Sequence, residues 1–125
     1  MKKKYKDKRI RFIDDLYDYN RLSILRHLAK IYFHGHSVGG TNPSLLEAMA
    51  SRAKIAAHGN EFNQSVLKGN ALFFHNSNDI QEIILKAEQR FNSKWIDKNV
   101  ELIKKEYNWE RVAESYIKVF KSLIK

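Results

Sequence analysis

Residues 34–49, with the sequence HGHSVGGTNPSLLEAM, combine features that could bind a phosphate or a sugar. Gly39 and Gly40 would let the backbone of a turn approach a ligand closely, because glycine has no side chain. A helix is expected to begin at Asn42 or Pro43, since asparagine is a favoured N-cap and proline suits the first helical position. The first N–H groups of that helix would lack intrahelical partners and would point at a bound anion.

Polar side chains in the same stretch could hydrogen-bond a sugar. Thr41, Asn42 and Ser44 carry neutral groups that match hydroxyls, and Glu47 is a charged acceptor one turn into the helix. A carboxylate can hold two vicinal hydroxyls, as on a ribose. The pattern is neither a Walker loop nor a GxGxxG fingerprint. A glycine-rich turn followed by an ordinary capped helix with a surface glutamate would show the same spacing.

Four short apolar runs, each bounded by Gly, Asn, Asp or Ser, predict buried strands that would position this segment. They are residues 9–13, 30–34, 54–58 and 71–75. Between them lie stripes with helical spacing, at Leu22, Leu25, Leu28 and Ala29, at Leu45, Leu46, Met49 and Ala50, and at Phe62, Val66 and Leu67. Strands that alternate with helices indicate βαβ units and a parallel sheet, in which ligands bind beyond the carboxyl ends of the strands.

The C-terminal third is expected to be helical. Its apolar stripes are Ile80, Ile83, Ile84, Ala87 and Phe91; Ile96, Val100 and Ile103; and Trp109, Val112, Ala113, Tyr116, Phe120, Leu123 and Ile124. The aromatic residues on apolar stripes are expected in the core, namely Phe33, Phe73, Phe74, Trp95, Trp109, Tyr116 and Phe120. The domain plan is a basic, disordered tail at 1–8, a βαβ sheet region at 9–76 and C-terminal helices at 77–125.

The chain carries a formal net charge of +9 over 125 residues. Nucleic acid, an anionic membrane surface and phosphorylated small molecules are partners that would use this charge. A solvated surface without such a partner fits it equally well. The last predicted helix places basic residues, including Lys118 and Lys121, beside an apolar stripe, so it could rest on an anionic bilayer.

Several classes of protein are excluded by what the sequence lacks. It contains no cysteine, which excludes disulfides, thiolate metal sites and a cysteine nucleophile. It has no run of about 18 apolar residues and no secretory signal, which favours a cytoplasmic protein. His34 and His36 could share a strand face as metal ligands, but no firm third ligand accompanies them. His58 and His75 end strands at the edge expected for His34 and are more simply explained as hydrogen-bonded residues there.

Residues 34–50 resemble the donor-site motif of family 4 retaining glycosyltransferases, and especially their rhamnosyltransferase-like branch. The resemblance extends over roughly residues 9–120. Residues 54–63 are similar to the strand and loop that follow the motif, and residues 107–113, YNWERVA, resemble the segment that opens the last helix. The resemblance implies the C-terminal, donor-binding lobe of the two-lobed GT-B fold. The expected fold is therefore α/β, a partial Rossmann-like lobe with about four parallel strands flanked by helices and a helical C-terminal third.

The family pattern implies roles for individual residues. Of its paired glutamates, the second matches Glu47 and would bind the ribose of a nucleoside diphosphate sugar, whereas the first would fall at Gly39 and is absent. His36 or Ser37 could replace the missing contact. The donor-binding set is His36, Ser37, Gly39, Gly40, Thr41, Asn42, Ser44 and Glu47, with no catalytic residue, metal or cofactor.

The chain also departs from the family in length. Two further βα units with the diphosphate-binding Arg and Lys, and the acceptor-binding lobe, are absent, and Ser51-Arg52 replaces a glycine after the motif helix. We therefore expect a truncated lobe that binds donor, transfers little sugar alone, and uses a saccharide or lipid-linked acceptor in surface polysaccharide synthesis. A missing N-terminal lobe or a homodimer could complete it at the inner face of the membrane. The rivals are a non-catalytic assembly module and a basic nucleic-acid-binding protein, which only the charge supports.

Overall fold

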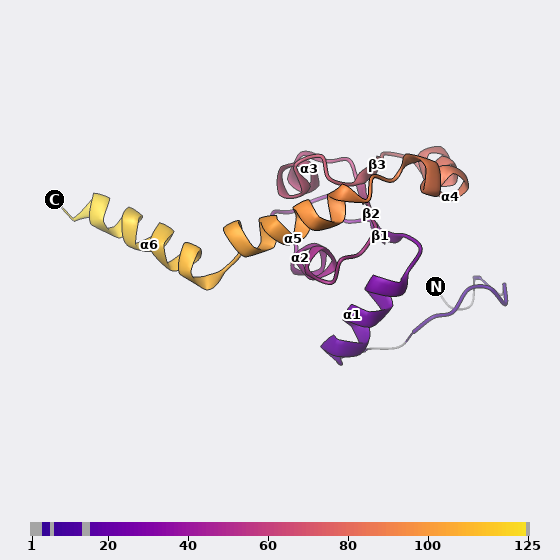
Figure 1. The fold of residues 1–125 in the computed structure, drawn as a ribbon, viewed down its shortest axis with the longest axis horizontal. Coiled ribbons are helices and arrows are strands. Elements are labelled where there is room, and N and C mark those ends of the chain that lie inside the picture. Colours follow the sequence, from indigo (N-terminus) through magenta and orange to yellow (C-terminus); the bar gives the residue numbers. More distant parts are fainter. Residues whose placement is uncertain (1–3, 6, 14–15, 125) are drawn as a thin grey trace.

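The computed structural model describes residues 4–5, 7–13 and 16–124 (Figure 1). Their order is helix, strand, helix, strand, helix, strand and then three consecutive helices. The elements are α1 (Tyr19–Leu28), β1 (Tyr32–His34), α2 (Pro43–Ala50), β2 (Ile55–His58), α3 (Glu61–Leu67), β3 (Leu72–Phe74), α4 (Ser77–Arg90), α5 (Lys94–Glu106) and α6 (Trp109–Leu123).

The sheet is parallel, in the order β1-β2-β3, and this confirms an α/β fold with βα units. In the central strand β2, Ala56 lies opposite Phe33 of β1 and Leu72 of β3. Alternate residues of β2 face opposite sides: Ile55 joins an apolar cluster with α2 and α3, and Ala56 joins a second with Ile83 of α4. Both residues are fully buried, so β2 is the strand around which two layers of helices pack.

The expected fourth strand is not formed, and that prediction was wrong. Residues 9–13 are irregular and exposed, and a local turn precedes them in which the N–H of Ile10 donates to the carbonyl oxygen of Asp7. Arg9 also forms an ion pair with Asp7 at 2.6 Å. A two-residue repeat would place Arg9 and Arg11 on one face of a strand. Burying both guanidinium groups in a doubly covered sheet would be costly, and this agrees with the exposed conformation of the segment.

α1 packs through only part of the face that was predicted. Leu25 and Leu28 of the expected stripe are exposed, at 45% and 74%, whereas Arg26 is buried at 8%. The predicted stripe is therefore only partly correct, since Leu22 and Ala29 are half-buried, and the guanidinium of Arg26 forms an ion pair with Glu47 of α2. The stripe of α2 is largely confirmed, since Leu45 and Met49 are fully buried.

α6 leaves the body of the molecule and extends to one side (Figure 1). Every residue from Trp109 to Ile124 is exposed. The expected core placement is therefore wrong for Trp109, Tyr116 and Phe120, which are 87%, 62% and 58% exposed. Among the other aromatic residues expected in the core, Phe74 is buried, Phe73 and Trp95 are half-buried, and Phe33 is exposed. No helix within the described residues is long and apolar enough to cross a bilayer.

The expected disordered tail at residues 1–8 falls partly on residues 1–3 and 6, which lie outside the described residues, and it stays a prediction. Residues 14–15 and 125 lie outside them as well.

Arg52 ends α2 in a left-handed conformation, with φ of 62°. Its Nη2 lies 2.8 Å from Oδ1 of Asp97 on α5, in an exposed ion pair. In an Asp97→Asn background, which lacks this pair, we expect Arg52→Gly to raise the free energy of unfolding by about 0.5–1 kcal/mol. The left-handed region costs a non-glycine residue about 1–2 kcal/mol, and the greater flexibility of glycine in the unfolded chain offsets part of that gain. Urea titration measures the change. Arg52→Ala in the same background is the control and should gain nothing; equal stability of the two variants would contradict the backbone explanation.

Candidate functional site

The loop of residues 35–42 joins β1 to α2 at the carboxyl edge of the sheet, and its first seven residues are exposed. Gly39 has a φ of +106°, which favours glycine, and a Cβ added at Gly39 or Gly40 would meet nothing within 4 Å. The loop therefore offers an open backbone surface, as expected of a segment that a ligand approaches closely.

Two asparagines of the next βα unit hold the base of this loop. The carbonyl oxygen of His36 accepts hydrogen bonds from Nδ2 of Asn60 and Nδ2 of Asn63, both at 2.9 Å. Asn63, only 4% exposed, also donates to the carbonyl oxygen of His58 at 2.9 Å. It thus ties the chain leaving β1 to the end of β2. Sequence reasoning missed this role; the available signal was an asparagine three residues after the N-cap Asn60, directly following a strand.

The N-terminus of α2 differs from the prediction. Pro43 has no N–H, the N–H of Ser44 donates to the side chain of Asn42 at 2.9 Å, and those of Leu45 and Leu46 reach the carbonyl oxygen of Asn42. The expected free N–H groups at this helix start are therefore already used, because asparagine at the N-cap and proline at the first position remove them. An anion here would have to draw on loop N–H groups and side chains instead.

Glu47 is held by a buried arginine. Its Oε2 lies 2.8 Å from Nη1 of Arg26, and the side chains are 39% and 9% exposed respectively. Among the described residues only Oε2 accepts a hydrogen bond. Arg26 also lies over the ring of Tyr32, 5.7 Å from its centroid. The carboxylate of Glu47 is therefore held in position by the almost fully buried guanidinium of Arg26.

A column of side chains runs from Arg26 along one face of β1 to the loop. Tyr32 stacks with His34 at 6.2 Å, and His34 stacks with His36 at 5.1 Å and an interplanar angle of 18°. Burial raises the pKa of Tyr32, although the nearby Arg26 lowers it. Burial lowers the pKa of His34, and the neighbouring His36 and Arg26 lower it further. His34 is therefore kept neutral, and its buried Nε2 has no partner among the described residues.

The other strand-end histidines lie beyond this column. His58 meets His75 edge to face at 5.9 Å, and the buried Nδ1 of His58 has no hydrogen-bond partner within the described part of the chain. The explanation as hydrogen-bonded residues therefore fails for this atom. No group of three or more His, Asp or Glu in residues 4–5, 7–13 and 16–124 is arranged to hold a metal ion.

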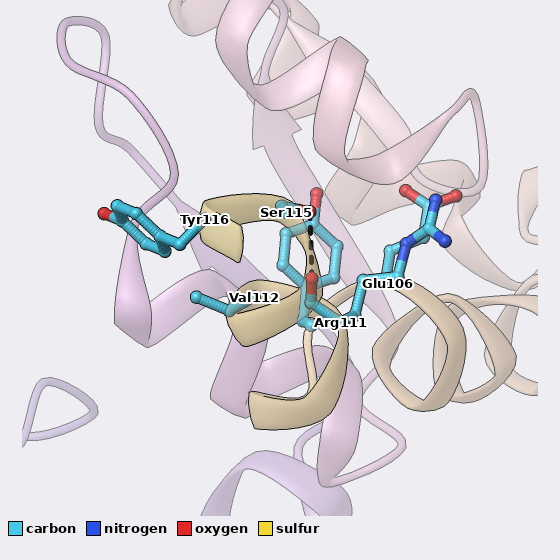
Figure 2. Close-up of a pocket in the computed structure, with 6 residues that line it drawn as sticks. Glu106, Arg111, Val112, Ser115 and Tyr116 are labelled. Carbon is cyan, nitrogen blue, oxygen red and sulfur yellow. Dashed lines mark hydrogen bonds between the residues drawn. The ribbon is translucent and has the colours of Figure 1, made fainter. Parts of the chain in front are cut away.

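All the predicted donor-binding residues lie in the loop or on α2. Those from His36 to Thr41 are exposed, and Asn42, Ser44 and Glu47 are half-buried. The described contacts of Glu47 run to α1, not to the loop. A separate hollow of about 390 Å³ lies at the elbow between α5 and α6 (Figure 2), and none of the predicted residues lines it. Its walls include Glu106, Tyr107 and Tyr116.

Asn63→Ala should lower the free energy of unfolding by about 1–2 kcal/mol, because the carbonyl oxygen of His58 loses its side-chain donor and that of His36 keeps only Asn60. Ser65→Ala, an exposed change on the same helix, should cost less than about 0.5 kcal/mol. Chemical denaturation monitored by far-UV circular dichroism compares the two. Equal costs would show that Asn63 does not hold the two strand ends.

Stability should also depend on His34. A neutral histidine whose folded pKa lies below its usual value of 6.5 contributes stability above pH 6.5, which is lost as the pH falls toward the folded pKa. His34→Gln should reduce this acid-side slope in unfolding titrations between about pH 7 and pH 5. An unchanged slope would assign the pH dependence to other groups.

Comparison of the chain with models of protein families, with curated proteins and with solved structures finds no match.

Proposed function

We propose that this chain is the donor-binding part of a sugar transferase, in which Glu47 accepts hydrogen bonds from the ribose hydroxyls of a nucleoside diphosphate sugar. The observation that carries the proposal is the half-exposed carboxylate of Glu47, anchored through one oxygen by the buried Arg26. A carboxylate in a fixed position suits a vicinal diol, because little ordering is left to occur on binding.

The loop supplies the rest of the proposed donor site. Gly39 and Gly40 expose their backbone, and Thr41 and Ser44 add hydroxyls on the chain that leads into α2. His36 lies three residues before Gly39 in the sequence, and its exposed ring stacks on that of His34. We assign these groups to contacts with the sugar and the phosphates. Ser37 is a further candidate for such a contact, and Asn42 acts mainly as the helix cap.

The proposed reaction transfers a glycosyl group from the donor to a saccharide or lipid-linked acceptor, with release of the nucleoside diphosphate. The N–H groups at the start of α2 already have partners, which limits how much negative charge this helix start stabilises. Leaving-group stabilisation needs donors aimed at the developing charge. We therefore propose that this chain binds donor and transfers little sugar alone. A second lobe or a second copy would supply the acceptor side, at the cytoplasmic face of a membrane where surface polysaccharide is made.

The test compares Glu47→Gln with the double variant Arg26→Met/Glu47→Gln. The single variant leaves the buried Arg26 without a full counter-charge and should lose about 1–3 kcal/mol of stability. The double variant removes both charges and should recover most of that loss. Because both variants lack the carboxylate, both should bind uridine or guanosine diphosphate sugars about tenfold more weakly than wild type, by calorimetry or ligand-observed NMR.

Glu101→Gln is the matched control, since Glu101 is an exposed glutamate on α5. It should retain wild-type affinity. If the double variant folds and keeps wild-type affinity, Glu47 is not part of the donor site. If the wild-type chain binds neither nucleotide sugar, the proposal is wrong.

A further inference from the structure

α6 divides cleanly into an apolar and a polar arc. At about 100° per residue, its apolar side chains occupy an arc of about 160°. They are Trp109, Val112, Ala113, Tyr116, Ile117, Val119, Phe120 and Leu123, continued by the C-cap residue Ile124. The opposite arc carries Glu110, Arg111, Glu114, Ser115, Lys118, Lys121 and Ser122. This separation is as sharp as that of a helix buried on one side, yet every residue of α6 is exposed.

Only the first turns of α6 approach the rest of the described chain. Trp109 and Val112 line an open apolar hollow of about 290 Å³ together with Leu46 of α2 and Tyr107 at the elbow. Beyond Tyr116 the helix extends away from the body (Figure 1). Phe120, Leu123 and Ile124 are 58%, 73% and 80% exposed. Apolar side chains in such a contiguous band mark a surface that another phase or molecule covers.

We propose that the apolar arc of α6 docks on the surface of an anionic bilayer, with the helix lying in the plane of the interface. The chain carries a net charge of +9, which a negatively charged membrane surface attracts. Lys104 and Lys105 lie in the last turn of α5, next to the elbow. On α6, Lys121 is the basic residue nearest to the edge of the apolar arc, whereas Arg111 and Lys118 lie on the opposite side of the helix.

The aromatic residues of α6 also suit the surface of a bilayer. Trp109 begins α6 and is 87% exposed, and Tyr116 stacks with Phe120 on the apolar arc at 6.3 Å. Trp and Tyr are favoured at the boundary between headgroups and acyl chains, because their rings are apolar and carry a polar atom. With 15 residues, α6 is about 22 Å long and would lie on a bilayer, not cross it.

A second copy of the chain fits these observations less well. Two chains each carrying +9 repel one another. A two-helix seam uses a narrow stripe of residues spaced three and four apart, over at least three heptads. The 15 residues of α6 span about two heptads, and the arc is wider than such a seam. The inference concerns a surface separate from the donor site and does not depend on donor binding.

The experiment is co-sedimentation of the full chain with phosphatidylcholine vesicles that contain phosphatidylglycerol, and with phosphatidylcholine vesicles alone. Wild type should sediment with the anionic vesicles, weakly with the neutral ones, and less as salt is raised. Phe120→Glu should reduce anionic-vesicle binding about tenfold or more, because a charge replaces an aromatic ring that the bilayer would bury.

Ser122→Glu introduces the same charge on the polar arc of the same helix and should reduce binding only a few-fold. Circular dichroism and thermal unfolding verify that both variants fold, which is expected because both side chains are exposed. The proposal is overturned by equal loss in the two variants, by equal binding to neutral vesicles, or by no sedimentation. Sedimentation velocity without lipid should give wild type and Phe120→Glu the same oligomeric state. A dimer that Phe120→Glu dissociates would assign the arc to a second copy instead.

Discussion

The ion pair between Arg26 and Glu47 joins α1 to α2 and explains how the candidate site is built. The guanidinium of Arg26 is nearly removed from water, so it needs the carboxylate that lies 2.8 Å away. It also covers the ring of Tyr32 on β1. One buried cation therefore fixes a helix, a strand and the acidic side chain proposed to bind ribose. Leu25 and Leu28 of α1 remain exposed.

The glycine loop depends on a second set of contacts, made by uncharged groups. Asn63 ties the chain after β1 to the end of β2, and the ring of the buried His34 stacks on that of His36 in the loop. The loop is therefore held at His36, whereas Gly39 and Gly40 are exposed. The capped start of α2 adds rigidity but uses the N–H groups that an anion would need. The arrangement suits recognition of hydroxyl groups better than stabilisation of a leaving diphosphate.

The sequence predicts those parts of the fold that apolar periodicity controls. The strands at Tyr32–His34, Ile55–His58 and Leu72–Phe74, the capped start of α2 and the helical C-terminal third all follow from local pattern. Its failures involve charge or missing partners. Arg9 and Arg11 would make a buried strand costly, the pair made by Arg26 cannot be read from α1 alone, and the stripe of α6 has no surface to cover in the described chain. Periodicity shows that a face is apolar, but not which molecule buries it.

The central claim is that the loop and Glu47 form one donor site, and it is tested most directly by amide chemical-shift mapping. The ¹⁵N-labelled chain would be titrated with a nucleoside diphosphate sugar and, separately, with the free sugar. The account predicts that the nucleotide sugar shifts signals from residues 36–44 and around Glu47. Smaller shifts should reach Arg26 and Asn63, and the free sugar should have little effect. Shifts confined to the α5–α6 elbow, or none in the loop at saturating ligand, would contradict it.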